Sequence, residues 1–412
     1  MQYGLIGEKL SHSFSKEIHE FFAPYNYELC EISRENLGSF LQKREFSAIN
    51  VTMPYKKEVI PHLDEISNSA QELQAVNCIV NRNGKLCGFN TDYFGMRDLM
   101  LKSKIDISSK KILILGTGGT ARTSALVCKD LGAKNITFVS REKKTNAITY
   151  DEAYELYNDA EIIINTTPVG MYTNAYSSPI DLNKFSNILA VFDAVYNPIR
   201  TQLILDAKRM GVYAEGGLYM LVSQAVHAVE LFLNEELSEN KIEEIYNKIL
   251  KEKENIVLIG MPSSGKTTVG KALADILNRQ LIDLDDEIEC HIGCTIAEFF
   301  KTHTEKDFRD IETQITKETA KKTGIVIATG GGCILREENV RALRSNGRIY
   351  FLDRNIDNLT PTDTRPLATK KEAMQKLYEA RYQIYLNTSD IKIDGNLTPK
   401  EEAELIREEF FK

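Results

Sequence analysis

The sequence predicts an α/β protein in which parallel sheets are flanked by helices. Short apolar runs of strand length alternate with helical patterns along most of its 412 residues. Two of the runs lead into a glycine-rich turn and then a helical segment, at 111-KILILGTGGTARTSALV-127 and 256-IVLIGMPSSGKTTVG-270. A strand, a glycine-rich turn and a helix in succession are typical of phosphate-binding units. The sequence therefore predicts two different phosphate sites in one chain.

The distribution of these elements predicts three domains. We expect the first at residues 1–101, completed by a helical segment at 217–250, the second at 102–216 and the third at 251–412. The last boundary follows the segment 235–254, in which eleven of twenty residues are charged. Its apolar residues recur at helical spacing, so we expect an amphipathic helix followed by a short connector.

Each expected strand is a short apolar run. The runs lie at 2–7, 47–52, 76–80, 111–116, 135–140, 161–167, 190–195, 255–260, 325–330 and 347–353. Helical patterns cover 13–22 and 217–233. Nearly continuous apolar strands are typical of parallel sheets that helices cover on both faces. The second and third domains should therefore contain such sheets.

Composition narrows the class of protein. A formal charge of −8 argues against a general nucleic-acid surface. No apolar run approaches the roughly 18 residues of a membrane span, and the N-terminal residues do not form a secretory signal. The seven cysteines have no framework spacing, which favours reduced thiols. We expect a cytoplasmic protein that binds neither membrane nor nucleic acid.

The first glycine-rich turn predicts a dinucleotide site. Its spacing is G-x-G-x-x-A between a strand and a helix, and the helix N-terminus offers N–H donors to a pyrophosphate. The next strand ends at Arg141, with Lys144 nearby, where an NAD enzyme usually has an acidic residue. These cations favour NADP, although Arg141 could also be a solvated loop residue. The expected NADP-binding residues are Gly116, Gly118, Gly119, Thr120, Ala121, Ser140, Arg141, Lys144, Thr166 and Gly217.

Further stretches on either side of this turn are informative together. They are 11-SHSFS-15, 50-NVTMPYK-56, 74-QAVN-77, 90-NTDYFG-95 and 217-GLYMLVSQA-225. In this order, over about residues 1–235, they resemble the shikimate dehydrogenase family. The resemblance implies that Lys56 and Asp92 form a catalytic pair. It also implies a substrate site made of Ser13, Ser15, Thr52, Asn77, Asp92, Tyr196 and Gln224.

The residue types suit the reduction of a ketone. Negative charge develops on the ketone oxygen as hydride reaches the carbon, and the ammonium of Lys56 can stabilise that charge and deliver a proton. Asp92 would keep the lysine oriented and charged. The chain departs from the family in having Lys16 where proline is usual and 74-QAVNC-78 where G-A-V-N-T is usual. These departures bear on substrate preference more than on the reaction.

The second glycine-rich turn, 260-GMPSSGKT-267, is a specific motif for ATP or GTP. Its backbone N–H groups would cradle phosphates, Lys266 would reach the β- and γ-phosphates, and Thr267 would bind Mg²⁺. The expected ATP-binding residues are Gly260, Pro262, Ser263, Ser264, Gly265, Lys266, Thr267, Thr268 and Arg365.

The residues after this turn narrow the reaction. They are 283-DLDDEI-288, 307-DFRDIE-312, 328-ATGGGC-333, 363-DTRPL-367 and 381-RYQIY-385. This series resembles the shikimate kinase family over about residues 254–412. The resemblance implies that Asp285 is catalytic with Lys266, that Asp283 acts near Mg²⁺ with Thr267, and that Arg365 belongs to a short lid. The implied substrate-binding residues are Asp285, Arg309, Gly330, Gly331, Gly332 and Arg381.

The two resemblances imply a Rossmann arrangement for the second domain and that of a P-loop kinase for the third. Together they predict a bifunctional enzyme that makes shikimate and then consumes it. The expected substrates are 3-dehydroshikimate and shikimate, and the expected cofactors are NADP(H), ATP and Mg²⁺. Three alternatives remain open. The first part could oxidise quinate, the second part could be a nucleotide-binding or weakly active kinase-like module, and the chain could have a structural role in a larger assembly. The sequence also leaves open whether the protein is a monomer or a homodimer.

Overall fold

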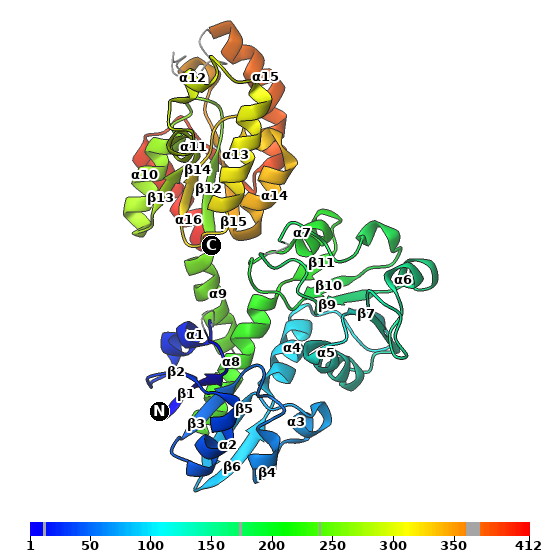
Figure 1. Cartoon of the computed structure of the whole chain (residues 1–412). Coiled ribbons are helices and arrows are strands. Elements are labelled where there is room, and N and C mark those ends of the chain that lie inside the picture. The colour runs from blue at the N-terminus through cyan, green and yellow to red at the C-terminus, as the bar shows by residue number, and fades with distance from the viewer. Residues whose placement is uncertain (11–13, 173–174, 239, 360–370) are drawn as a thin grey trace. The chain divides into compact units, whose positions relative to one another are not determined.

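The computed structural model describes residues 1–412 except 11–13, 173–174, 239 and 360–370 (Figure 1). The chain divides into two compact units. The first consists of Met1–Thr173, Ser177–Asn197 and Asp206–Ile249, and the second of Asn174–Tyr176, Pro198–Leu205 and Leu250–Lys412. Two sheets belong to the first unit and a third sheet to the second.

The first sheet is mixed and has the order β2-β1-β3-β5-β6-β4. Its strands are β1 (Tyr3–Gly7), β2 (Glu28–Glu31), β3 (Ala48–Val51), β4 (Glu65–Ile66), β5 (Cys78–Arg82) and β6 (Lys85–Phe89). The helices that accompany it are α1 (Ser15–Phe22), α2 (Arg34–Lys43), α3 (Asn68–Leu73), α4 (Thr91–Lys102) and α8 (Gly217–Leu233). Strands β1, β2 and β3 are parallel, whereas β5 runs antiparallel to both β3 and β6.

Successive residues of β1 pack on opposite faces of this sheet, as strand geometry requires. Ile6 lies in a buried cluster with Leu41 of α2, whereas Leu5 lies in another with Phe232 of α8. Helix α8 therefore covers the face opposite to α2. It also packs closely along α4.

The second sheet is wholly parallel and has the order β11-β10-β9-β7-β8. Its strands are β7 (Lys111–Leu115), β8 (Asn135–Val139), β9 (Ile162–Asn165), β10 (Ala190–Asp193) and β11 (Tyr213–Glu215), and the helices between them are α5 (Gly119–Asp130), α6 (Tyr150–Leu156) and α7 (Gln202–Arg209). The chain passes from β7 to β8 on one side and then to β9 on the other. The order therefore reverses at β7, and in open α/β sheets ligands bind at such a reversal.

The third sheet is also parallel and has the order β13-β14-β12-β15-β16. Its strands are β12 (Asn255–Ile259), β13 (Leu281–Asp283), β14 (Val326–Ala328), β15 (Gly347–Asp353) and β16 (Ile391–Asp394). Helix α9 (Lys241–Lys253) begins in the first unit and ends in the second, since the boundary follows Ile249. The other helices of this part are α10 (Lys266–Leu277), α11 (Leu284–Ile292), α12 (Ile296–Phe299), α13 (Glu305–Thr319), α14 (Glu337–Asn346), α15 (Lys371–Thr388) and α16 (Pro399–Phe411). Val257 of β12 packs with Leu343 of α14, and Leu258 packs with Phe410 of α16, so helices cover both faces.

The predicted fold class is confirmed: an α/β chain with a Rossmann-like sheet and a P-loop sheet. The charged segment before the P-loop forms helix α9, but this helix begins only at Lys241. Four short 3₁₀ helices complete the described secondary structure: η1 (Ile60–His62), η2 (Leu182–Lys184), η3 (Cys333–Leu335) and η4 (Ile356–Asn358). Within the described ranges, none of the helices combines the length and apolar character that a membrane span needs.

Candidate active sites

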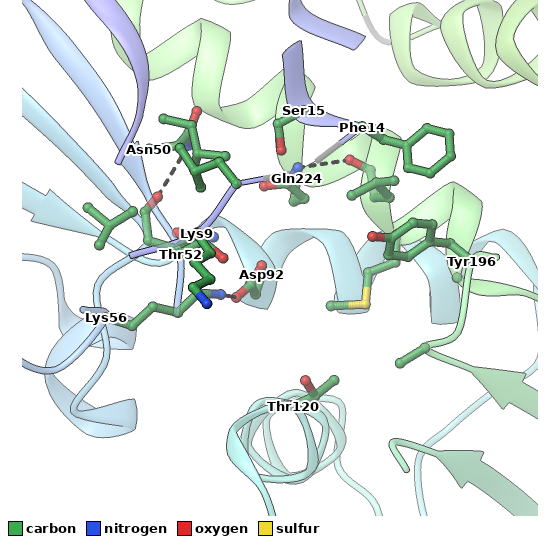
Figure 2. A pocket seen from close by; sticks show the side chains of 18 residues that line it. Lys9, Phe14, Ser15, Asn50, Thr52, Lys56, Asp92, Thr120, Tyr196 and Gln224 are labelled. Carbon is green, nitrogen blue, oxygen red and sulfur yellow. Dashed lines mark hydrogen bonds and ion pairs between the residues drawn. The ribbon is translucent and has the colours of Figure 1, made fainter. Parts of the chain in front are cut away.

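A cavity of about 390 Å³ opens in the first unit (Figure 2). Polar side chains reach it from the carboxyl ends of β1 and β3, from the start of α4 and from the middle of α8. The predicted residues that line it are Ser15, Thr52, Lys56, Asn77, Asp92, Thr120, Tyr196, Gly217 and Gln224. Ser13 lies outside the described residues. The cavity thus joins side chains that are up to about two hundred positions apart in the sequence.

Lys56 and Asp92 form an ion pair inside this cavity. Their Nζ and Oδ2 atoms are 2.6 Å apart, and the side chains are 30% and 24% exposed. Asp92 stands in the first turn of α4, whose N-terminus is capped by the Asn90 side chain. Both groups can therefore touch a ligand while holding each other in place. An ammonium in this position can donate a hydrogen bond to an oxygen that becomes negatively charged.

Tyr196 lies at another part of the cavity wall. Its ring meets that of Phe14 edge-on, with the ring centroids 5.5 Å apart. Burial raises the pKa of Tyr196, so its phenol remains protonated at neutral pH and can donate a hydrogen bond.

Two polar residues of the cavity were not predicted, Lys9 and Asn50. Lys9 follows β1 and forms no ion pair with any of the described residues. Asn50 is the first residue of 50-NVTMPYK-56 and shares a strand face with Thr52, since alternate residues point the same way. That spacing is a signal that would have identified Asn50.

The dinucleotide turn follows β7, the strand at which the second sheet reverses. Gly116 has φ +107°, and a Cβ there would approach the Thr166 Oγ1 atom to 2.8 Å. Thr166 donates a 2.6 Å hydrogen bond to the Leu115 carbonyl, which holds it against the turn. A Cβ at Gly118 or Gly119 would meet no atom within 4 Å, so the start of α5 is open to a ligand. The turn fits a dinucleotide pyrophosphate.

The cations predicted beside this turn differ in their contacts. Lys144 donates a 3.1 Å hydrogen bond to the Thr117 hydroxyl, which places its ammonium at the glycine turn. Arg141 is exposed, and the buried Ser140 hydroxyl bonds to the Glu142 carbonyl. Positive charge is therefore available where a 2′-phosphate would extend from the turn.

The P-loop of the second unit joins β12 to α10. Lys266 is buried and donates hydrogen bonds of 3.0 and 2.9 Å to the carbonyl oxygens of Gly260 and Met261. Gly265 has φ +92°, a conformation that glycine adopts without strain. The buried Ser264 hydroxyl has no hydrogen-bond partner among the described residues. A loop with a buried lysine and an unsatisfied donor fits an ATP phosphate group.

The other predicted P-loop residues lie around this core. Pro262 is buried, Ser263 is half-buried with φ +65°, and Thr267 and Thr268 are exposed in the first turn of α10. Arg365 lies outside the described residues.

Thr267 and Asp283 provide a pair of oxygen atoms beside the P-loop. The Thr267 hydroxyl donates a 2.5 Å hydrogen bond to Asp283 Oδ2. The other carboxylate oxygen of Asp283 accepts the Asp285 N–H at 3.0 Å and so caps α11. Oxygen donors of this kind, next to a phosphate site, fit Mg²⁺, which takes few protein ligands and keeps substrate phosphates and waters.

The glycines at 330–332 explain how distant residues meet. A Cβ on Gly330 would approach Asp285 Oδ1 to 2.6 Å, and one on Gly331 would approach the Pro262 ring to 2.8 Å. A Cβ on Gly332 would collide with the Arg309 guanidinium. Because these glycines have no side chains, Asp285, the P-loop and Arg309 can all approach the same stretch of backbone, the glycine strip 330–332.

Arg381 belongs to the same place. Its Nη1 donates a 3.0 Å hydrogen bond to the Gly331 carbonyl, and the side chain is 7% exposed. The Tyr385 hydroxyl donates to the same carbonyl. Two arginines from α13 and α15 thus flank the glycine strip, a geometry suited to a carboxylate ligand.

The sequence did not identify Glu312, which orients Arg309. Its carboxylate accepts hydrogen bonds of 3.0 and 2.8 Å from Arg309 Nη1, and Glu312 is 1% exposed. Burial raises the pKa of Glu312, Arg309 opposes this effect, and the net direction is upward. The ion pair with Glu312 therefore orients the Arg309 guanidinium.

Comparison with known proteins assigns the chain to a family. A shikimate dehydrogenase (NADP(+)) of Clostridium beijerinckii is 36% identical over 262 residues, which cover 60% of this chain and 96% of that protein. The chain belongs to the shikimate dehydrogenase family. The model of the shikimate dehydrogenase substrate-binding domain matches residues 5–79.

Solved structures of shikimate dehydrogenases agree with this assignment. A chorismate mutase/shikimate 5-dehydrogenase fusion protein from Clostridium acetobutylicum has 36% identity and a TM-score of 0.56, covering 60% of this chain and 96% of that one. The Thermus thermophilus shikimate 5-dehydrogenase, in complex with NADP(H) and shikimate, has 27% identity and a TM-score of 0.53, covering 60% and 99%.

The remaining part of the chain matches a second family. The shikimate kinase model covers residues 262–410, which include the P-loop lysine, the glycine strip and both arginines. The resemblance to a shikimate dehydrogenase followed by a shikimate kinase is therefore confirmed.

Proposed function

We propose that this chain catalyses two consecutive reactions on one metabolite. The first part reduces 3-dehydroshikimate to shikimate with NADPH, and the second transfers the γ-phosphoryl group of MgATP to the 3-hydroxyl of shikimate. The observation that carries this proposal is that a lysine–aspartate pair in a polar cavity and a P-loop facing a glycine strip with two arginines occur in one chain.

In the reductase site, NADPH supplies hydride when it is bound. Lys56 donates a hydrogen bond to the ketone oxygen, stabilises the negative charge that develops there and gives up a proton to it. Asp92 Oδ2 lies 2.6 Å from Lys56 Nζ and orients the lysine side chain. Thr52, Asn77 and Gln224 bind ring oxygens, and Ser13, Ser15 and Tyr196 bind the carboxylate end.

In the kinase site, MgATP supplies the phosphoryl group. Asp285 accepts a hydrogen bond from the attacking hydroxyl, and Lys266 stabilises the charge on the transferred group. Arg309 and Arg381 bind the substrate carboxylate as planar donors. Thr267 and Asp283 would hold Mg²⁺, and most of the catalysis is positioning and charge stabilisation.

Three functional regions follow from this proposal. Residues 1–101 with 217–250 bind the substrate of the reductase, residues 102–216 bind NADP(H), and residues 251–412 form the kinase. Arg365 would contribute to closing the kinase site over ATP.

The test is one incubation of purified protein with 3-dehydroshikimate, NADPH and MgATP, with products identified by mass. Shikimate 3-phosphate is expected. Lys56→Ala should abolish formation of shikimate but retain phosphorylation of added shikimate, and Lys266→Ala should do the reverse. Loss of both activities in a folded Lys56→Ala or Lys266→Ala protein would refute two independent sites. Preferential oxidation of quinate with NAD would instead refute the proposed substrate and cofactor of the first part.

A further inference from the structure

The cavity of the first unit contains three amide side chains whose orientations are fixed by backbone groups. They belong to Asn50, Asn77 and Gln224. Asn77 Oδ1 accepts the Thr91 N–H at 2.7 Å, and Gln224 Nε2 donates to the Leu221 carbonyl at 3.0 Å. A backbone N–H can only donate and a carbonyl can only accept, so these two bonds decide which end of each amide is which.

The Thr91 hydroxyl joins two of these amides. Asn77 Nδ2 donates to Thr91 Oγ1 at 3.1 Å, and Thr91 Oγ1 lies 3.2 Å from Gln224 Oε1. Because an amide nitrogen can only donate, the hydroxyl accepts from Asn77 Nδ2. Its single proton has two acceptors in reach, Gln224 Oε1 at 3.2 Å and Asn77 Oδ1 at 3.4 Å, and the shorter contact favours Gln224. Thr91 is fully buried, so it does not reach a ligand itself.

Asn50 follows the same rule. Its Nδ2 donates to the Asn77 carbonyl at 3.2 Å, and its Oδ1 accepts the Tyr27 hydroxyl at 2.8 Å. Each of the three amide oxygens is therefore occupied by a protein donor. Each amide nitrogen keeps one N–H that has no partner among the residues described, and Lys56 adds an ammonium.

We propose that Thr91 is a positioning residue whose hydroxyl ties Asn77 to Gln224, so that both amides, with the polarity that the backbone groups set, are held with N–H donors toward the ligand. The site then selects molecules with oxygen acceptors at these positions. The ring oxygens of the proposed substrate are such acceptors, and for the identity of the ligand the inference rests on the proposed function. A buried donor left without an acceptor lowers affinity, which gives the selection its strength.

The experiment compares Thr91→Val with Thr91→Ser in the full chain, measuring shikimate oxidation with NADP⁺ and shikimate binding by calorimetry. Every protein used for calorimetry, including the reference, also carries Arg309→Ala, which weakens binding at the proposed kinase site. Thr91→Val removes the hydroxyl at nearly constant volume and should raise the KM and Kd for shikimate about tenfold, the effect of one to two neutral hydrogen bonds. The kcat should change by less than about threefold, because Lys56 and Asp92 remain paired. Thr91→Ser should restore wild-type values.

Thr123→Val is the matched control. Thr123 is a buried threonine of α5 in the same unit, and its hydroxyl bonds only to the Gly119 carbonyl among the described residues. It should leave KM for shikimate unchanged. A Thr91→Val protein with wild-type KM, or one that Thr91→Ser does not rescue, would overturn the proposal.

Gln224→Glu tests polarity directly and does not depend on the folding of Thr91→Val. Glutamate keeps the shape but offers acceptors only, so shikimate binding should fall more than tenfold. Binding equal to that of the wild type would overturn the donor assignment. Wild-type protein that neither binds nor oxidises shikimate would contradict the proposed function itself, whereas wild-type activity with unaffected variants would contradict only the role of Thr91.

Discussion

Replacing Glu312 by glutamine should impair the kinase, although Glu312 is not itself one of the residues proposed to bind a ligand. Glu312 and Arg309 are 2% and 11% exposed in their side chains, and the carboxylate accepts at 2.8 and 3.0 Å from Nη1. Glutamine has nearly the same shape but no charge. The Arg309 cation would remain buried without its strongest partner, and its guanidinium would no longer be fixed beside Gly332.

The magnitude follows from the kind of contact that is lost. A hydrogen bond to a charged group contributes about 1.5–3 kcal/mol, which corresponds to roughly 10- to 150-fold in an equilibrium or rate ratio. Because Arg309 would still be present, we expect kcat/KM for shikimate to fall about 30-fold, mostly through KM. Removal of one member of a buried ion pair also destabilises the fold, by up to about 3–5 kcal/mol.

The assay couples ADP formation to NADH oxidation at saturating ATP, with thermal unfolding to show that the variant is folded. Glu305→Gln is the matched control, because Glu305 also pairs with Arg309, at 3.2 Å, but is 54% exposed. An exposed pair contributes about 0.2–1 kcal/mol, so this variant should lose less than about fivefold. Equal losses in the two variants, or an effect of Glu312→Gln below threefold, would refute the role of the buried carboxylate.

Three further predictions concern other parts of the chain. Arg141→Gln should raise the KM for NADPH about tenfold, because one contact to the 2′-phosphate is lost, and should leave the KM for NADH nearly unchanged. Steady-state kinetics with the two coenzymes would measure this, and equal effects on both KM values would contradict the role of Arg141 in selecting NADP. Gly332→Ala should lower kinase kcat/KM about 100-fold, because a Cβ there displaces the Arg309 guanidinium, and dehydrogenase rates in the same preparation should stay constant. Burial lowers the pKa of His227, but the hydrogen bonds that its imidazolium donates to the carboxylates of Asp98 and Glu230 outweigh this, so its pKa is raised. That stabilisation is fully present below the unfolded pKa of about 6.5 and is lost as pH rises through the folded value. His227→Gln should therefore lower the thermal stability of the dehydrogenase part more at pH 6 than at pH 9, and a pH-independent difference would disprove the coupling.

The buried strands were predictable because they are continuous apolar runs. The residues of β12 are all buried, and both its faces contact helices, so every position favours an apolar residue. Strand β2, 28-ELCE-31, lies at a sheet edge with most residues exposed, and its charged ends give no such signal. It is a strand because its backbone pairs with that of β1, and the pattern of side chains in the sequence does not indicate this pairing.

The candidate sites divide in a similar way. Residues in compact motifs, such as Lys266, could be assigned a role from the motif itself and from the order of the motifs in the sequence. Glu312 could not, because a glutamate three residues after an arginine is usually an exposed helix pair. Only the fold shows that this pair is buried, and only the fold brings Thr91 between Asn77 and Gln224.

We expect the two proposed sites to recognise oxygen-rich ligands by different means, because their walls are made of different groups. In the first unit a ligand would meet, besides the Lys56–Asp92 pair, neutral amides whose oxygens are already occupied, so we expect selection to depend largely on N–H donors held by Thr91 and the backbone. In the second unit a ligand would meet bare glycine backbone flanked by Arg309 and Arg381, so we expect selection to depend on charge and on the absence of side chains. Neutral hydrogen bonds discriminate by geometry and are little affected by salt, whereas arginine–carboxylate contacts are stronger but partly screened. The reductase should therefore keep its KM for shikimate as ionic strength rises from 0.05 to about 0.5 M, while the KM of the kinase should increase several-fold. Steady-state kinetics of both activities on one preparation would measure this, and parallel changes in the two KM values would contradict the distinction.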